Sequence, residues 1–103
     1  MLIQLNTDNH IEGRDRLMTH VQERFSHDLR RFSDHITRLE VHLSDQNGGK
    51  PGTSDKQCIL EARVAGLDPV AVTHHAANID QALNGARDKL IATLSTRLGK
   101  IQK

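Results

Sequence analysis

The spacing of apolar residues changes twice along this 103-residue chain, and these changes limit the folds that it can adopt. From about Gly13, apolar residues recur every three or four positions, which predicts an amphipathic helix. The middle of the chain alternates apolar and polar residues, and a helical period returns from Asn78. The buried stripes predicted for the two helices are Leu17, Val21, Phe25, Leu29 and Phe32, and then Ile79, Leu83, Ala86, Leu90, Leu94, Leu98 and Ile101.

Four strands are predicted around these helices, at residues 2–6, 37–43, 57–64 and 70–76. In the second strand the residues expected to face inward are Thr37, Leu39, Val41 and Leu43, because their neighbours are polar or charged. Residues 45–55 are rich in Gly and Pro, which predicts a long mobile hairpin tip. The sequence therefore predicts an α+β fold of order β-α-β-β-β-α, with two helices packed on one face of a four-stranded sheet.

The length is that of one ordinary domain, so residues 1–103 are expected to form a single folded unit. The single cysteine, Cys58, has no partner for an internal disulfide, and no targeting segment is visible. These features favour the reducing cytoplasm. The apolar runs are far shorter than the roughly 20 residues that cross a bilayer, so no membrane partner is expected.

Fourteen Lys and Arg against thirteen Asp and Glu give a net charge of only +1, so any contact with nucleic acid must be local. Two rows of side chains on the predicted helices suit such a contact. One row holds His20, Arg24, His27 and Arg31, and the other holds Lys89, Ala92, Thr96, Lys100 and Lys103. Together they are expected to form one basic groove that contacts RNA phosphates. The alternative is that both rows are ordinary solvated helix faces, which the pattern alone favours.

The predicted start of the second helix carries a resemblance to a known family. Residues 77–90, which include Asn78, Ile79, Asp80, Gln81 and Gly85, are similar to the signature of ribosome hibernation promoting factors. This family includes ribosome-associated inhibitor A and was formerly labelled sigma-54 modulation proteins. The helix with Arg24 and Phe25, residues 36–43 and the strand meander follow in the family's order. The resemblance implies that a chain of this length has the ribosome-binding domain alone, without a C-terminal dimerisation domain.

The resemblance implies a translation inhibitor that binds the decoding region of the small ribosomal subunit and blocks messenger and transfer RNA. It implies contact with ribosomal RNA phosphates through basic helix faces. It implies no catalysis, no cofactor and no small-molecule substrate. The candidate RNA-binding residues are Arg24, His27, Arg31, Lys89, Arg97, Lys100 and Lys103. The chain departs from the family pattern at Asn78, Asp80, Asn84, Ala92 and Thr96, and Asp80 replaces a tyrosine.

These departures leave a second function open, namely a domain with the same fold that has lost ribosome affinity and binds a protein or itself. Other chemistry has little support in the sequence. His74 and His75 are neighbours in a strand and should point to opposite faces, so no metal site is expected. Cys58 is expected to be a core residue, and Gly48-Gly49-Lys50 lacks the rest of a phosphate-binding loop. The two phenylalanines are expected in the core, which disfavours a base-stacking surface.

Overall fold

The computed structural model describes residues 1–8, 11–46 and 56–101, with side chains as far as residue 99. The predicted hairpin tip at residues 47–55 lies outside the described residues, as does Lys103. The elements are β1 (Leu2–Thr7), α1 (Arg14–Asp28), the 3-10 turn η1 (Arg30–Phe32), β2 (Ile36–Asp45), β3 (Lys56–Val64), β4 (Val70–Ala76) and α2 (Ile79–Ile101). The predicted order β-α-β-β-β-α is confirmed.

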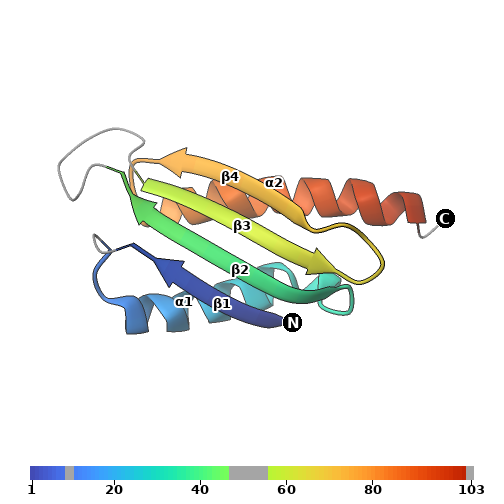
Figure 1. The fold of residues 1–103 in the computed structure, drawn as a ribbon, viewed down its shortest axis with the longest axis horizontal. Helices are drawn as coiled ribbons and strands as arrows, with labels where there is room; N and C mark the ends of the chain where they lie inside the picture. The colour runs from blue at the N-terminus through green and yellow to red at the C-terminus, as the bar shows by residue number, and fades with distance from the viewer. Residues whose placement is uncertain (9–10, 47–55, 102–103) are drawn as a thin grey trace.

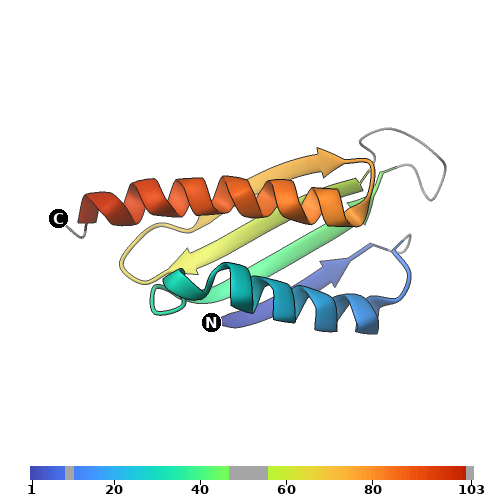
Figure 2. The same ribbon diagram turned by 180° about the vertical axis from the view of Figure 1, so that it is seen from behind.

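The strands form one sheet in the order β1-β2-β3-β4, and both helices cover the same face of it (Figures 1 and 2). β1 and β2 run parallel, whereas β2, β3 and β4 pair antiparallel. A parallel pair requires a long crossover between its strands, and α1 supplies it. The sheet is therefore mixed, with α1 near β1 and α2 alongside β4.

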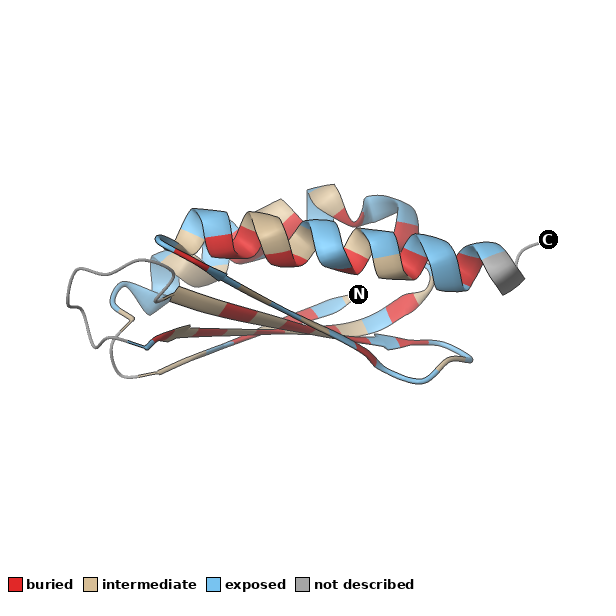
Figure 3. Ribbon diagram, turned by 90° about the horizontal axis from the view of Figure 1, so that it is seen from above, coloured by how far each residue is buried: buried red, intermediate tan, exposed pale blue. Residues whose placement is uncertain are grey.

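The core lies between the sheet and the helices, where Figure 3 shows the buried residues of both layers facing each other. The alternating pattern places Leu39, Val41 and Leu43 of β2 in this layer, each at most 2% exposed. From the helices, Phe25, Leu83 and Leu90 close over them and are fully buried. Burial of such side chains is the main favourable contribution to folding, so the strand and helix periods in the sequence account for the architecture.

The start of β2 differs from the prediction. Thr37 was expected to face inward, but it is exposed, and Ile36 is buried instead at 1% exposure. The register with β3 shifts between Ile36 and Arg38, so Thr37 is an extra residue in the strand. This bulge allows Ile36 and Leu39 both to reach the core although three positions separate them, which a regular strand does not permit.

The first helix is also shorter than its apolar stripe. α1 ends at Asp28, and the chain tightens into η1 before Phe32. A 3-10 turn has three residues per turn, so Leu29 and Phe32 lie on the same side and are both buried. The strand β2 extends through Asp45, which was expected to begin the loop. Its carboxylate is 4% exposed and lies 3.4 Å from Lys56 Nζ, an ion pair that joins the ends of β2 and β3.

Candidate nucleic-acid interface

The surface between the two helices is built around Asp28, the last residue of α1. Its carboxylate accepts a hydrogen bond of 3.0 Å from Arg87 of α2 and lies 3.8 Å from Arg24 of its own helix. The three side chains are between 16% and 25% exposed. The hydrogen bond to Asp28 is the main cause that raises the pKa of Arg87, with Asp88 adding to it and partial burial opposing it. Two arginines are thus held by one carboxylate at the centre of the helix layer.

Asp80, in the first turn of α2, extends this cluster of charges. Its carboxylate lies 3.8 Å from Arg24 Nη1 and 3.5 Å from His20 Nε2. Asp80 is well exposed, at 72%, whereas Arg24 is mostly covered. α2 begins here because Asn78 Oδ1 accepts a hydrogen bond of 2.8 Å from the backbone N–H of Gln81 and so caps the helix. This cap fixes Asp80 opposite α1.

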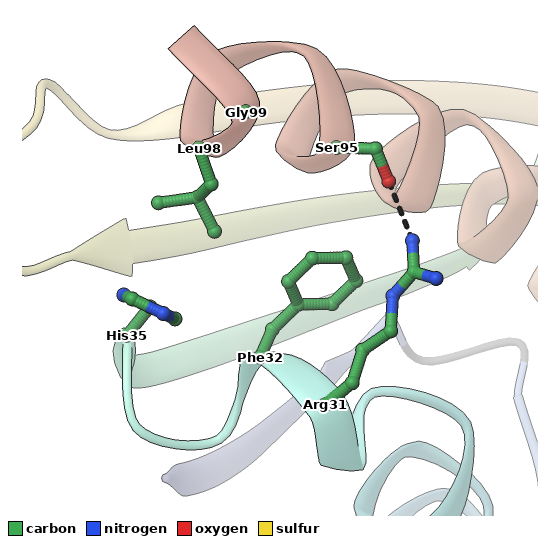
Figure 4. A pocket seen from close by; sticks show the side chains of 6 residues that line it. All are labelled: Arg31, Phe32, His35, Ser95, Leu98 and Gly99. Atoms are coloured by element: carbon green, nitrogen blue, oxygen red, sulfur yellow. Dashed lines mark hydrogen bonds between the residues drawn. The ribbon is translucent and has the colours of Figure 1, made fainter. Parts of the chain in front are cut away.

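Arg31 lies at the opposite end of the interhelical surface. Its guanidinium stacks over the ring of Phe32, 4.5 Å from the centroid, and donates a hydrogen bond of 2.6 Å to Ser95 Oγ of α2 (Figure 4). Beside it, Arg30 Nη1 donates to the backbone carbonyl of His27 at 3.1 Å. Arg30, Arg31 and His27 are all exposed. The last turn of α1 and η1 therefore present three basic side chains together.

The predicted row on α2 is found on the other flank of that helix. Lys89 Nζ donates a hydrogen bond of 2.7 Å to the backbone carbonyl of Thr73 in β4. Arg97 is exposed on the same flank, beside a shallow depression with Ala92, Thr93 and Thr96. Among the described residues of the two rows, Lys89 is turned toward β4 whereas Arg24 and Arg31 contact α2, so these residues do not line one groove, contrary to the expectation. The residues of α2 that face α1 are instead Asp80, Arg87 and Ser95.

The seven candidate residues thus fall into separate groups. Arg24, His27 and Arg31 lie on α1 and η1, facing or flanking α2, whereas Lys89 and Arg97 lie on the flank of α2 next to β4. Lys100 belongs to α2, but its side chain is not among those described. The sequence analysis did not single out Arg87. Arg87 follows the core position Leu83 by one helical turn, so the sequence places it beside the buried stripe. A cation that is partly buried there needs a partner.

The outer face of the sheet carries a second group of polar residues. Glu40 and Glu61 are directly opposite each other on β2 and β3, and His42 Nε2 lies 3.8 Å from Glu61. The ligand atoms of these three side chains lie within 4.8 Å of one another. Arg38 donates to Glu40 at 3.0 Å and supplies the charge that this carboxylate needs. We therefore interpret the group as an ion-pair network. As expected, His74 and His75 point to opposite faces of β4.

Cys58 lies on the inward face of β3 and is fully buried, as the alternation predicted. Burial raises the pKa of its thiol to about 12, and the positive charge of Arg24 offsets only part of this effect. A nucleophilic cysteine needs an accessible thiolate at neutral pH. Cys58 is therefore a core residue.

A mixed four-stranded sheet with two helices on one face, and basic side chains gathered on those helices, defines a small α+β binding domain. Residues 5–102 match the family described as sigma 54 modulation protein / S30EA ribosomal protein. The chain therefore belongs to this family, which is that of the hibernation promoting factors. Its members are ribosome-associated factors and not enzymes. Membership links the chain to ribosome hibernation and the inhibition of translation.

A search among characterised proteins gave no significant match. Over the part of the chain that the structure describes, neither helix has the length and hydropathy needed to cross a bilayer.

Proposed function

We propose that this protein binds the small ribosomal subunit in its decoding region and inhibits translation in the cytoplasm by occupying the path of messenger and transfer RNA. The contact is made by the helix layer, through Arg24, His27, Arg31, Lys89, Arg97, Lys100 and Lys103. No step of catalysis is involved. The phosphates of structured RNA are the chemical group that such side chains bind, through charge and shape rather than base sequence.

The observation that carries this proposal is the difference between paired and unpaired arginines on the helix layer. Asp28 and Asp80 neutralise Arg24 and Arg87 at its centre. Within residues 1–8, 11–46 and 56–99, no ion pair involves Arg30, Arg31 or Arg97, and all three are exposed. An exposed cation without a carboxylate partner can bind a phosphate without first breaking an ion pair. The available positive charge is therefore local, although the net charge is only +1.

Co-sedimentation with vacant small subunits over a series of salt concentrations tests the proposal. Binding should be saturable, and its affinity should fall steeply with salt because each phosphate contact releases counterions. The double variant Arg31→Glu, Arg97→Glu should lose at least about tenfold in affinity at physiological salt. The control Arg16→Glu, Arg63→Glu makes the same change in net charge, at exposed positions on the first turn of α1 and on the outer sheet face. It should bind within about twofold of wild type.

Equal losses in both double variants would mean that net charge, and not the helix surface, governs the interaction. Absence of binding by the wild-type protein at low salt would overturn the proposed function.

The second candidate function is a domain of the same fold that has lost ribosome affinity and binds a protein partner. One observation favours it, namely that Asp80 holds Arg24 in an ion pair. The family resemblance leads us to expect a tyrosine at this position. The same experiment separates the two functions, because a protein-binding module would not bind vacant small subunits even at low salt.

A further inference from the structure

A pocket of about 300 Å³ opens on the helix layer, between η1 and the C-terminal half of α2. Its lining residues are Arg31, Phe32, His35, Ser95, Leu98 and Gly99. Figure 4 shows the ring of Phe32 and the side chain of Leu98 pointing into the space between the two elements, with Arg31 on one side and His35 on the other. The pocket has the size of the smallest ligand sites, so it suits one small, flat group.

The chemistry of the lining combines an apolar base with polar groups at its rim. Phe32 and Leu98 are 6% and 5% exposed, so they offer edges of apolar surface and not a free platform. Arg31 has five N–H donors, and a hydrogen bond to Ser95 uses one of them. Contact with the ring of Phe32 and the hydrogen bond to Ser95 hold the guanidinium in place, so its remaining donors have a fixed direction. A planar ligand with acceptor atoms on its edge fits these groups.

From this geometry we infer that the pocket takes one unstacked nucleobase of ribosomal RNA. The inference rests on the proposed function and specifies one of its contacts. Bases removed from a stack are recognised by hydrogen bonds to their edges, which the remaining N–H donors of Arg31 can supply, and by contact with apolar side chains, here the edges of Phe32 and Leu98. Arg30, next to Arg31 in η1 and exposed, suits a phosphate beside such a base. Guanine presents two adjacent acceptors that match the fork of an arginine.

This pocket modifies an expectation from the sequence. Both phenylalanines were expected to be unavailable to RNA, and Phe25 is indeed fully buried. Phe32 differs because the 3-10 turn brings it to the end of the core, where Arg31 covers its ring and its edge lines the pocket.

Gly99 allows the pocket to be filled without disturbing the core. A Cβ built at Gly99 meets no atom within 4 Å, so a side chain there has room. Long side chains on a helix lean back toward its N-terminus, which directs the leucine of Gly99→Leu over Ser95 and the pocket mouth. Gly99→Ala is the matched control, because it makes the same backbone change and leaves most of the pocket open. Thermal unfolding of both variants checks that the fold is retained.

Two measurements on vacant small subunits test the inference. In co-sedimentation, Gly99→Leu should lose about tenfold in affinity, since it excludes the base and removes the hydrogen bonds of an arginine fork to the base edge, which contribute that order of binding. The slope of log affinity against log salt should stay unchanged, because no phosphate contact is removed. In chemical probing at saturating protein, wild type and Gly99→Ala should protect the edge of one base that the arginine fork binds, N7 in the case of guanine, and this atom should stay reactive with Gly99→Leu.

Equal affinity of Gly99→Leu and wild type would overturn the inference and leave the proposed function standing. A loss of affinity without any difference in base reactivity would also overturn it, because the occupant would then be part of a ribosomal protein. If wild type does not bind small subunits at all, the proposed function fails, and the inference fails with it.

Discussion

Asp80 places a carboxylate of α2 against two basic residues of α1. Its carboxylate competes with any external phosphate for Arg24 and His20, at 3.8 Å and 3.5 Å. Because Asp80 is 72% exposed, its ion pair with Arg24 contributes little to the stability of the folded protein. The residue therefore acts on affinity and not on the fold.

The substitution Asp80→Asn should tighten binding to vacant small subunits by about twofold to fivefold at physiological salt. The carboxamide keeps the size of the side chain but no longer neutralises Arg24. If Arg24 then gains one phosphate contact, the slope of log affinity against log salt should become steeper by about 0.9 at most. Co-sedimentation over a salt series measures both quantities.

Asp68→Asn is the control for this change, because Asp68 is an exposed residue before β4 and lies away from the interhelical surface. It changes the net charge equally. If both variants bind alike, the effect of Asp80 is one of net charge, and its pairing with Arg24 has no role in binding.

The burial of Cys58 makes the free energy of unfolding depend on pH, and it sets the direction of this dependence. Its thiol has a pKa of about 12 in the folded protein, against an ordinary value near 9.0. Above about pH 9 the unfolded chain therefore loses a proton that the folded chain keeps. The free energy of unfolding should fall as pH rises from about 9 toward 12, by at most about 1.4 kcal/mol per pH unit from this group.

Denaturant unfolding of wild type and Cys58→Ala between pH 7 and pH 10 measures this effect. The variant should be less stable at pH 7, because it leaves a small cavity, but the stability difference should shrink above pH 9. The absence of tyrosine from the chain removes one other group that titrates in this range. A stability difference that does not change with pH would contradict the buried, protonated thiol.

Among the elements, α2 approaches β4 closely at a single glycine. A Cβ at Gly85 would overlap with Cδ2 and Cγ of His74, so the whole imidazole would have to move. The resemblance in sequence included this glycine, and the structure gives its physical reason. It lets the helix lie directly on the inward-facing His74.

Gly85→Ala should therefore destabilise the protein by about 1–3 kcal/mol, although alanine favours helices. Gly99→Ala, in the same helix, has open space around its Cβ and should be neutral or stabilising by up to about 1 kcal/mol. Thermal and denaturant unfolding of the two variants provide the comparison. Equal stability of both would show that His74 moves aside at no cost.

The sequence predicted the order and type of the elements because each has a clear apolar period. It did not predict the bulge at Thr37 or the change from α1 to η1 before Phe32. In both places two buried residues lie three positions apart, at Ile36 and Leu39 and at Leu29 and Phe32. That spacing is compatible with several local structures. Only packing against the opposite layer decides among them.

At the scale of the whole molecule, the candidate site was predicted less completely than the fold. Helical spacing identified which residues share a row, but not which flank of α2 faces α1. Lys89 instead reaches the exposed edge of the sheet, where its Nζ binds the carbonyl of Thr73. Arg14 does the same at the other edge, with a hydrogen bond of 2.9 Å to the carbonyl of Leu5. Both cations cover edge strands that otherwise present unpaired carbonyls.

This arrangement predicts that the two flanks of the helix layer contribute differently to the affinity for small ribosomal subunits. Arg31→Glu should weaken binding to small subunits more than Lys89→Glu, because Arg31 lies beside other unpaired cations whereas Lys89 is turned toward β4. We expect losses of about tenfold and about threefold in affinity at physiological salt.

The double variant should lose about thirtyfold, since the two sites share no partner among the described residues and their free energies should add. Co-sedimentation of the three variants measures these values. A larger loss for Lys89→Glu would place the main RNA contact over β4, and Arg97 and the end of α2 would then be its centre. A double variant no weaker than Arg31→Glu alone would restrict the contact to the flank of α2 that faces α1, where Arg30 and Arg31 have no carboxylate partner among the described residues.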